Sequence, residues 1–150
     1  MNDQPPRVVV ITGASQGIGA SLVPAYRKLG YAVLGTSRTI TPSDDPMFAT
    51  VQGVKVPSAL ASLTEGGLAA VTKSLATEYG ATGIRVNAVS PGVIKTVTHA
   101  PETYDDLGTL HPIGRMVETS DVVSAIMYLE SAPFVTGEFM HVDGGQSAGH

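Results

Sequence analysis

The chain has 150 residues, of which 43% are hydrophobic and 15% charged, and its formal net charge is −4. This composition supports one packed domain and excludes an intrinsically disordered chain. The acidic balance gives no basic patch for nucleic acid, and the absence of cysteine excludes a disulfide scaffold and a thiolate metal site. No apolar run approaches the ~20 residues of a membrane span, and the polar, flexible Met1–Pro6 has no signal-peptide core. We therefore expect a cytoplasmic domain without nucleic-acid, membrane or metal partners.

Strands and helices alternate along the first fifty residues. The β-branched run Arg7–Thr12 predicts a strand buried on both faces, and the periodicity that follows predicts a helix over Gly17–Leu29. Pro24 lies inside this helix, where it removes a backbone hydrogen bond at a cost of about 3 kcal/mol. Tyr31–Thr36 predicts a second strand, and Met47–Val51 a short third one. The first two strands and their helix form a unit that implies parallel strands and a right-handed crossover.

The second half continues the same alternation. Ser62–Glu65 is a capping box before a helix that reaches Tyr79. Ile84–Val89 predicts a strand, Thr119–Glu130 a helix, and Glu138–Val142 a last short strand. The pattern is that of a doubly wound α/β fold with one parallel sheet in a single domain over residues 1–150. The helix before Tyr79 carries one apolar stripe, made of Leu68, Val71, Leu75 and Tyr79.

A glycine-rich turn, Thr12-Gly-Ala-Ser-Gln-Gly-Ile-Gly19, joins the first strand to the first helix. Glycine lets backbone approach a pyrophosphate without obstruction by Cβ, and a helix N-terminus offers free N–H groups to it. In this strand–turn–helix context the turn predicts dinucleotide binding. The candidate contacts in the turn are Gly13, Ser15, Gln16, Gly17, Ile18 and Gly19.

The same turn also fits the G-x-S-x-G pattern of a hydrolase nucleophile elbow, with Ser15 as the nucleophile. Candidate bases for that reading are His99, His111 and His141. In hydrolases the elbow follows several earlier strands of the sheet in the sequence, whereas only one predicted strand precedes Ser15. Nucleotide binding is therefore favoured, and the hydrolase stays an alternative.

Arg38 stands at the end of the second strand. An acidic residue there would accept a hydrogen bond from a ribose 2′-hydroxyl, whereas an arginine accommodates a 2′-phosphate. We interpret Arg38 as a determinant of NADP(H) binding, with NAD(H) as the other option. The alternative role for Arg38 is that of a solvated surface residue.

Together these segments resemble the short-chain dehydrogenase/reductase family. The resemblance is carried in order by Thr12–Gly19, Thr72–Ala76, Gly83–Gly92 and Val142–Gly145, and it extends from residue 7 to residue 147. It implies a three-layer Rossmann-type sheet, and hydride transfer between a nicotinamide and a carbonyl or alcohol substrate. It also implies that the segment after the Ile84–Val89 strand passes the nicotinamide end of the cofactor, through Pro91, Gly92, Ile94 and Thr96. Asn87 also matches the family and is expected to be structural.

The family's catalytic pair is missing from this sequence. Family members use a tyrosine and a lysine four residues later, and the matching positions here are Ala61 and Glu65. No Tyr-x-x-x-Lys occurs anywhere in the chain. Since the lysine lowers the tyrosine's pKa, its loss removes proton transfer, and no catalytic residue is assigned. The alternatives are an active oxidoreductase with another proton route, and a non-enzymatic subunit or interaction partner.

Compared with the family, the chain is shortened internally by about 100 residues, which removes central strands 4 and 5 of the fold. The first strand is then expected to pair directly with the Ile84–Val89 strand, or two chains to exchange elements in a homo-oligomer. Lys73 and Arg85 are expected on solvated faces.

Overall fold

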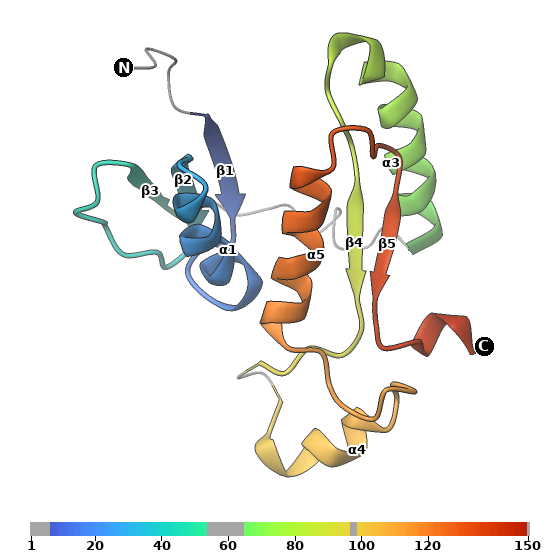
Figure 1. Ribbon diagram of the computed structural model, residues 1–150. Helices are drawn as coiled ribbons and strands as arrows, with labels where there is room; N and C mark the ends of the chain where they lie inside the picture. The colour runs from blue at the N-terminus through green and yellow to red at the C-terminus, as the bar shows by residue number, and fades with distance from the viewer. Residues whose placement is uncertain (1–6, 54–64, 97–98, 150) are drawn as a thin grey trace. The chain divides into compact units, whose positions relative to one another are not determined.

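The computed structural model describes residues 7–53, 65–96 and 99–149 (Figure 1). The chain divides into two compact units, Met1–Pro57 and Ser58–His150. In the described part of the chain, no helix is long and apolar enough to cross a bilayer.

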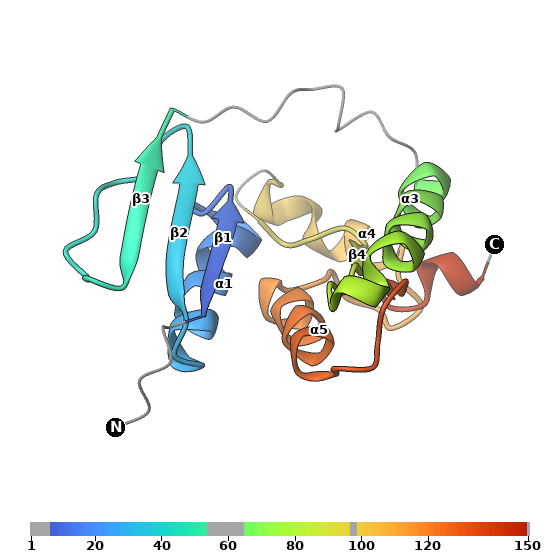
Figure 2. The ribbon, with the colours of Figure 1, turned by 90° about the horizontal axis from the view of Figure 1, so that it is seen from above.

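The first unit contains a parallel three-stranded sheet in the order β1-β2-β3 (Figure 2). Its strands are β1 (Val8–Thr12), β2 (Ala32–Ser37) and β3 (Phe48–Gln52). The helix α1 (Gly17–Lys28) connects β1 to β2, and it stays continuous through Pro24. The predicted strand–helix–strand unit and the short third strand are therefore confirmed.

One face of β1 is buried and the other is not. Ile11 lies in the core of this unit, with Tyr26 and Val33, whereas Val8 and Val10 are 66% and 60% exposed. Because side chains alternate across a strand, Val8 and Val10 share the face opposite to that of Ile11. The prediction of a strand buried on both faces is wrong.

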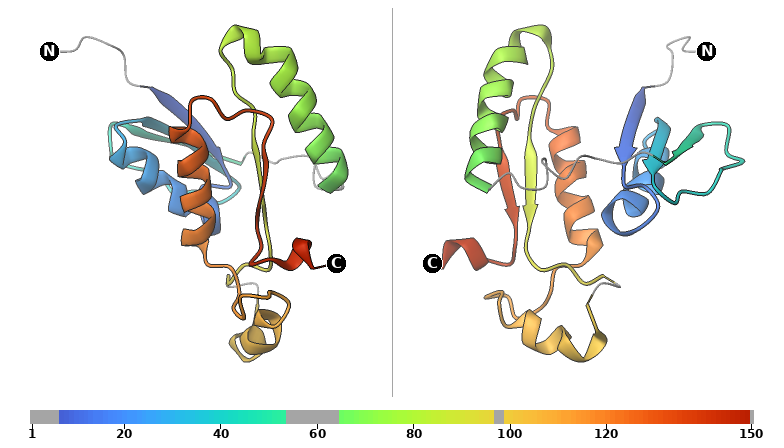
Figure 3. Two further views of the ribbon diagram at one scale, coloured as in Figure 1. Left: turned by 45° about the vertical axis from the view of Figure 1, so that its right-hand side comes forward. Right: turned by 180° about the vertical axis from the view of Figure 1, so that it is seen from behind.

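The second unit is a three-layer arrangement around two parallel strands, β4 (Ala88–Pro91) and β5 (Phe139–Val142). The helices α3 (Glu65–Tyr79) and α5 (Thr119–Ser131) cover opposite faces of this pair (Figures 1 and 3). β4 thus pairs with β5 within the second unit. The pairing expected between β1 and the Ile84–Val89 segment would join the two units, and it stays a prediction. The connection between β4 and α5 contains the short helix α4 (Tyr104–Gly108), which the sequence pattern did not predict.

The predicted strand at Ile84 begins four residues later, at Ala88. The preceding residues bond to the loop before β5 instead: Val86 N–H donates to Thr136 Oγ1, and Gly137 N–H donates to Val86 O. The Asn87 amide donates to Val135 O and its oxygen accepts from Glu138 N–H, each at 3.0 Å. This confirms the structural role expected of Asn87.

Arg85 is partly buried rather than solvated, so that prediction is wrong. Its guanidinium donates to the carbonyls of Leu129, Glu130 and Val135 at 2.7 to 3.1 Å. These carbonyls lie at the C-terminus of α5 and just beyond it, where a cation also complements the helix dipole. At its other end α5 is closed by a capping box between Glu118 and Asp121.

The apolar stripe of α3 is largely exposed. Leu68, Val71 and Tyr79 are all exposed, while Thr72 and Ala76 are buried. Ala76 lies against Gly137, whose ideal Cβ would come within 3.4 Å of the alanine methyl, so small residues set the close approach of the helix. The capping serine, Ser62, lies outside the described residues.

Candidate functional site

The glycine turn has a backbone that needs glycine at three positions. Gly13 and Gly17 have φ of 69° and 56°, in the left-handed region that other residues rarely adopt. A Cβ on Gly19 would lie 2.4 Å from Gly13 O, so the turn folds directly onto the first turn of α1. In contrast, a Cβ on Gly13 or Gly17 would meet nothing within 4 Å. The turn therefore presents open backbone, as a phosphate cradle requires.

The N-terminus of α1 starts at this turn. Its N-cap, Gln16, is extended and makes no side-chain capping bond, and the first turn contains no acidic residue. Free N–H groups in the first turn, from Gly17 to Gly19, and the positive end of the helix dipole favour a bound anion. Ile18 is half-buried between the two glycines. The six turn residues predicted from the sequence thus lie together at one helix N-terminus.

Hydroxyl groups tie the turn to the end of β2. Ser15 Oγ lies 2.6 Å from Ser37 Oγ, and Ala14 N–H donates to Thr36 O at 3.1 Å. The side-chain bonds of Ser15 are to the hydroxyls of Ser37 and Thr39. A nucleophilic serine would instead bond to an imidazole base, so this arrangement gives no support to the hydrolase alternative.

Arg38 is the next residue in the sequence after Ser37, whose hydroxyl contacts Ser15. Its side chain is exposed and has no hydrogen bond or ion pair with any residue in the described ranges. Beside Ser15 lies a hollow of about 440 Å³ between α1 and the segment 39–43. Farther along the loop that follows Arg38, Asp45 accepts from Arg27 through both carboxylate oxygens, and this contact holds the pKa of the Asp45 carboxyl below its usual range. The loop that carries Arg38 is therefore anchored at both ends.

The second set of candidate residues follows β4 in the other unit. Gly92 N–H donates to Val142 O on β5 at 3.0 Å. Beyond it, Ile94 forms an isolated parallel bridge with Val117, in which Lys95 N–H donates to Val117 O and Val117 N–H to Val93 O. Pro91, Ile94 and Thr96 are half-buried. The segment from Pro91 to Thr96 thus bends at Val93 and Thr96 and is held by residues far along the sequence.

His111 packs against this segment and accepts a hydrogen bond from it, a role that the sequence did not predict. The imidazole is 1% exposed, and its Nε2 accepts the N–H of Val93 at 3.0 Å. It packs so closely that a Cβ on Gly92 would lie 2.5 Å from Nε2. The sequence marked His111 only as a possible hydrolase base, and a lone histidine carries no signal of such a contact.

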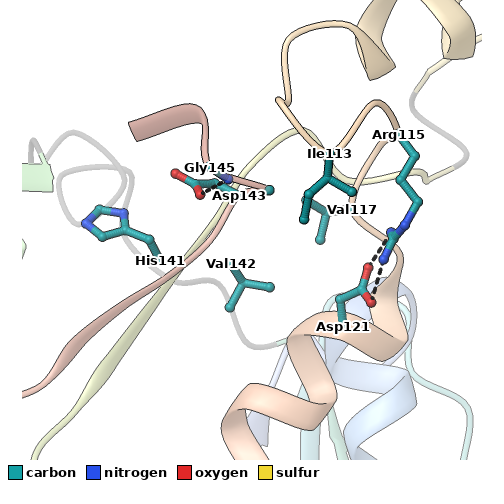
Figure 4. A pocket seen from close by; sticks show the side chains of 9 residues that line it. Ile113, Arg115, Val117, Asp121, His141, Val142, Asp143 and Gly145 are labelled. Atoms are coloured by element: carbon teal, nitrogen blue, oxygen red, sulfur yellow. Dashed lines mark hydrogen bonds and ion pairs between the residues drawn. The ribbon is translucent and has the colours of Figure 1, made fainter. Parts of the chain in front are cut away.

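A second hollow, of about 330 Å³, lies where β5 ends (Figure 4). On one side, Arg115 bonds to both oxygens of Asp121 and holds the pKa of that carboxyl below its usual range. On the other, Asp143 accepts from Ser147 and from Gly145 N–H, which lowers the pKa of Asp143. Both carboxylates are engaged in holding local turns and are not poised to move protons.

The two sets of candidate cofactor contacts lie in different units, and each set is gathered within its own unit. Of the two positions that match the family's catalytic pair, Ala61 lies outside the described residues, and Glu65 is the first residue of α3. No three metal-ligating side chains gather within the described ranges.

Comparison with known proteins agrees with this architecture. A family model described as enoyl-(acyl carrier protein) reductase matches residues 49–147. An uncharacterised oxidoreductase of Schizosaccharomyces pombe is 31% identical over 152 residues, which cover 96% of this chain and 50% of the relative. The chain spans half or less of the length of the curated relatives it matches.

Two solved structures share the fold. ElxO with NADP bound superposes with a TM-score of 0.79 at 20% identity, over 96% of this chain and 100% of that one. 4-Hydroxyisoleucine dehydrogenase complexed with NADH gives 0.79 at 19% identity, over the same shares. The family match covers more than half of this chain, and the fold is an α/β Rossmann-like one with parallel sheets. The chain belongs to the short-chain dehydrogenase/reductase family, in a shortened form.

Proposed function

We propose that this protein binds a nicotinamide dinucleotide, and that it prefers NADP(H) to NAD(H). The glycine turn is the observation that carries the proposal, because Gly13, Gly17 and Gly19 expose backbone at an uncapped helix N-terminus. The diphosphate would be held there, with Ser15, Gln16 and Ile18 beside it. The cofactor is the group to which such a turn is suited, since its two phosphates need N–H donors rather than side-chain bulk.

Arg38 supports the preference for NADP(H). It follows the Ser15–Ser37 tie, its side chain is exposed, and no residue in the described ranges neutralises it. A 2′-phosphate at the end of β2 would therefore find an unpaired cation. The solved relatives include complexes of both kinds, one with NADP and one with NADH, so the choice rests on this residue.

The nicotinamide end would lie along Pro91, Gly92, Ile94 and Thr96. A bound nicotinamide supplies or accepts hydride, so the substrate class would be a small carbonyl or alcohol compound. Without the tyrosine and lysine, no side chain of this sequence is assigned to the proton that must accompany the hydride. We therefore expect binding to persist and catalysis to be severely impaired.

The exposed α3 side chains Leu68, Val71 and Tyr79 favour a homo-oligomer, with or without exchanged elements, and they also suit a non-enzymatic role as a subunit. The single-domain organisation and the cytoplasmic location stay predictions.

Fluorescence titration with NADPH and NADH tests the cofactor proposal. NADPH should saturate the protein below ~1 mM and bind at least about tenfold more tightly than NADH. In Arg38→Gln this difference should largely vanish, with NADH binding unchanged. Lys28→Gln, which removes an exposed cation at the other end of α1, is the matched control and should bind both cofactors normally. Absence of NADPH binding at millimolar cofactor would contradict the proposal.

Turnover with a panel of ketones, aldehydes and alcohols tests the impairment separately. Tight NADPH binding with an inert panel is the expected result. Cofactor-dependent turnover at the rates of ordinary enzymes, ~1 s⁻¹ or faster, would favour the active alternative with another proton route.

A further inference from the structure

The hydrogen bond between His111 and Val93 fixes the protonation state of the imidazole. Val93 N–H can only donate, so Nε2 must offer a lone pair, and the single proton of the ring lies on Nδ1. Nδ1 is itself buried and has no hydrogen-bond partner in the described part of the chain. His111 is thus built into this site as a neutral acceptor.

The packing around the ring leaves it no alternative position. It is 1% exposed, and the nearest glycine positions have no space for a methyl group. A Cβ on Gly92 would lie 2.5 Å from Nε2, and one on Gly144 would lie 3.0 Å from His111 Cβ. Rotation of the imidazole would therefore require the backbone on one side of it to move.

The charged groups around His111 are already engaged. Asp143 precedes Gly144 and accepts from Gly145 N–H and from Ser147. In the chain that follows His111, Arg115 bonds to Asp121. Past Val93, Lys95 forms an ion pair with Glu118 at 3.4 Å, and on β5 the imidazole of His141 is exposed. None of these groups bonds to Nδ1, which has no hydrogen-bond partner within the described residues.

A second proton on the ring would place an Nε2–H against the N–H of Val93. Two donors then face one another without water, and the backbone of Gly92 and Val93 must move away from the ring. That backbone continues directly into Ile94 and Thr96. Val93 O also accepts from Val117, so a shift would disturb the short bridge that holds Ile94 extended.

We propose that His111 is a positioning residue of the nicotinamide segment: its neutral imidazole holds Val93 in place, and acid releases the segment. The effect on cofactor rests on the function proposed above, but the contact between His111 and Val93 does not. Acid is then expected to weaken the binding of the nicotinamide half and to leave the adenosine half unaffected, because the glycine turn is held without any histidine.

Calorimetric titration with NADP⁺ and with 2′,5′-ADP separates the two halves. The ratio of their affinities cancels the protonation of the 2′-phosphate, which both ligands carry. In the natural protein this ratio should be several-fold lower at acid pH than at neutral pH, because a ring with a proton on both nitrogens cannot accept from Val93 N–H. His111→Gln offers an oxygen to Val93 but does not titrate, so it should keep the neutral ratio within about threefold and lose the pH dependence. His111→Leu offers no acceptor and should give the low ratio at every pH. A ratio that falls equally in His111→Gln would overturn the proposal.

NMR of the ligand-free protein tests the contact without any cofactor. The imidazole nitrogens should show a proton on Nδ1 at neutral pH, and the amide signal of Val93 should shift in step with protonation of His111. The amide should stay constant in His111→Gln. A proton on Nε2, a Val93 amide that ignores the titration, or an imidazole that stays neutral until the protein unfolds would each contradict the proposal. If NADP⁺ does not bind at all, the proposed function fails, and the NMR result still decides the role of His111.

Discussion

The two loops that carry the candidate residues are held in their conformations by different kinds of contact. Each follows the C-terminal end of a parallel strand: the glycine turn follows β1, and the Gly92–Thr96 segment follows β4. The turn is shaped by close backbone contact between residues six apart, Gly13 and Gly19. The later segment is held by His111, Val117 and Val142, which lie far along the chain.

This difference determines how each loop can fail. The conformation of the glycine turn depends on close backbone packing, so one added carbon atom at Gly19 should disrupt it. The Gly92–Thr96 segment is limited by hydrogen bonds, so it should respond to changes in protonation and in the stability of the second unit. Perturbations of the two loops should therefore separate, with the adenosine half of a cofactor reporting on the turn.

The largest effect is expected from Gly19→Ala. Its Cβ would lie 2.4 Å from a backbone oxygen that cannot yield alone, so the turn must open. We expect NADP⁺ and 2′,5′-ADP to lose at least about 100-fold in affinity by calorimetry, or roughly 3 kcal/mol. The matched control is Gly80→Ala, at a glycine with open space and ordinary backbone, which should bind normally. Normal binding by Gly19→Ala would show that the turn is not the phosphate site.

A substantial loss of stability is expected from Arg85→Met. The change removes three hydrogen bonds at the C-terminus of α5. The free energy of unfolding of the second unit should therefore fall by roughly 3 kcal/mol. Urea denaturation measures this loss, while 2′,5′-ADP binding under native conditions should be preserved. Lys73→Met removes an exposed cation of α3 and should stay within about 0.5 kcal/mol of the natural protein. If the two substitutions lowered the free energy of unfolding by the same amount, the hydrogen bonds of Arg85 would contribute no stability, as expected of a solvated residue.

Ser37→Ala should have a smaller effect, confined to the glycine turn. It removes the 2.6 Å contact with Ser15 and the bond from Thr39 N–H, worth about 1 kcal/mol together, so 2′,5′-ADP affinity should fall about threefold to tenfold. The ratio of NADP⁺ to 2′,5′-ADP affinity should not change. A change in that ratio would mean that the two loops do not respond separately.

The smallest effect concerns acid stability of the second unit. Arg115 lowers the pKa of Asp121, so the folded state binds a proton there less readily than the unfolded chain. The stabilisation is then complete above the ordinary carboxyl range and is lost as pH falls below about 4. Asp121→Asn should remove part of this acid dependence in urea denaturation, with a modest effect because the pair is solvated. An unchanged acid profile would show that the ion pair contributes nothing.

Local features of this protein could be predicted from its sequence. The glycine turn, the first three strands and the end of β5 are specified by residues close together in the chain, so their patterns were readable. Burial was not: the stripe on α3 has the spacing of a buried face, but spacing alone does not say whether a partner covers it. The same holds for Val8 and Val10 on β1.

Contacts between distant residues could not be predicted either. Arg85 looked solvated because nothing near it in the sequence marks the carbonyls that it caps 44 to 50 residues later. His111 was only one of several candidate bases in the sequence. Its contact with Val93, 18 residues earlier, could not be predicted because it forms only when the chain is folded. Such polar contacts are set by the approach of whole elements, which residue spacing does not encode.

A crystal structure of the protein grown with NADP⁺ tests the central claim most directly. We expect density for the diphosphate against the backbone of Gly13–Gly19, with the 2′-phosphate within hydrogen-bonding distance of Arg38. An empty glycine turn at saturating NADP⁺, or a cofactor bound elsewhere on the molecule, would contradict it.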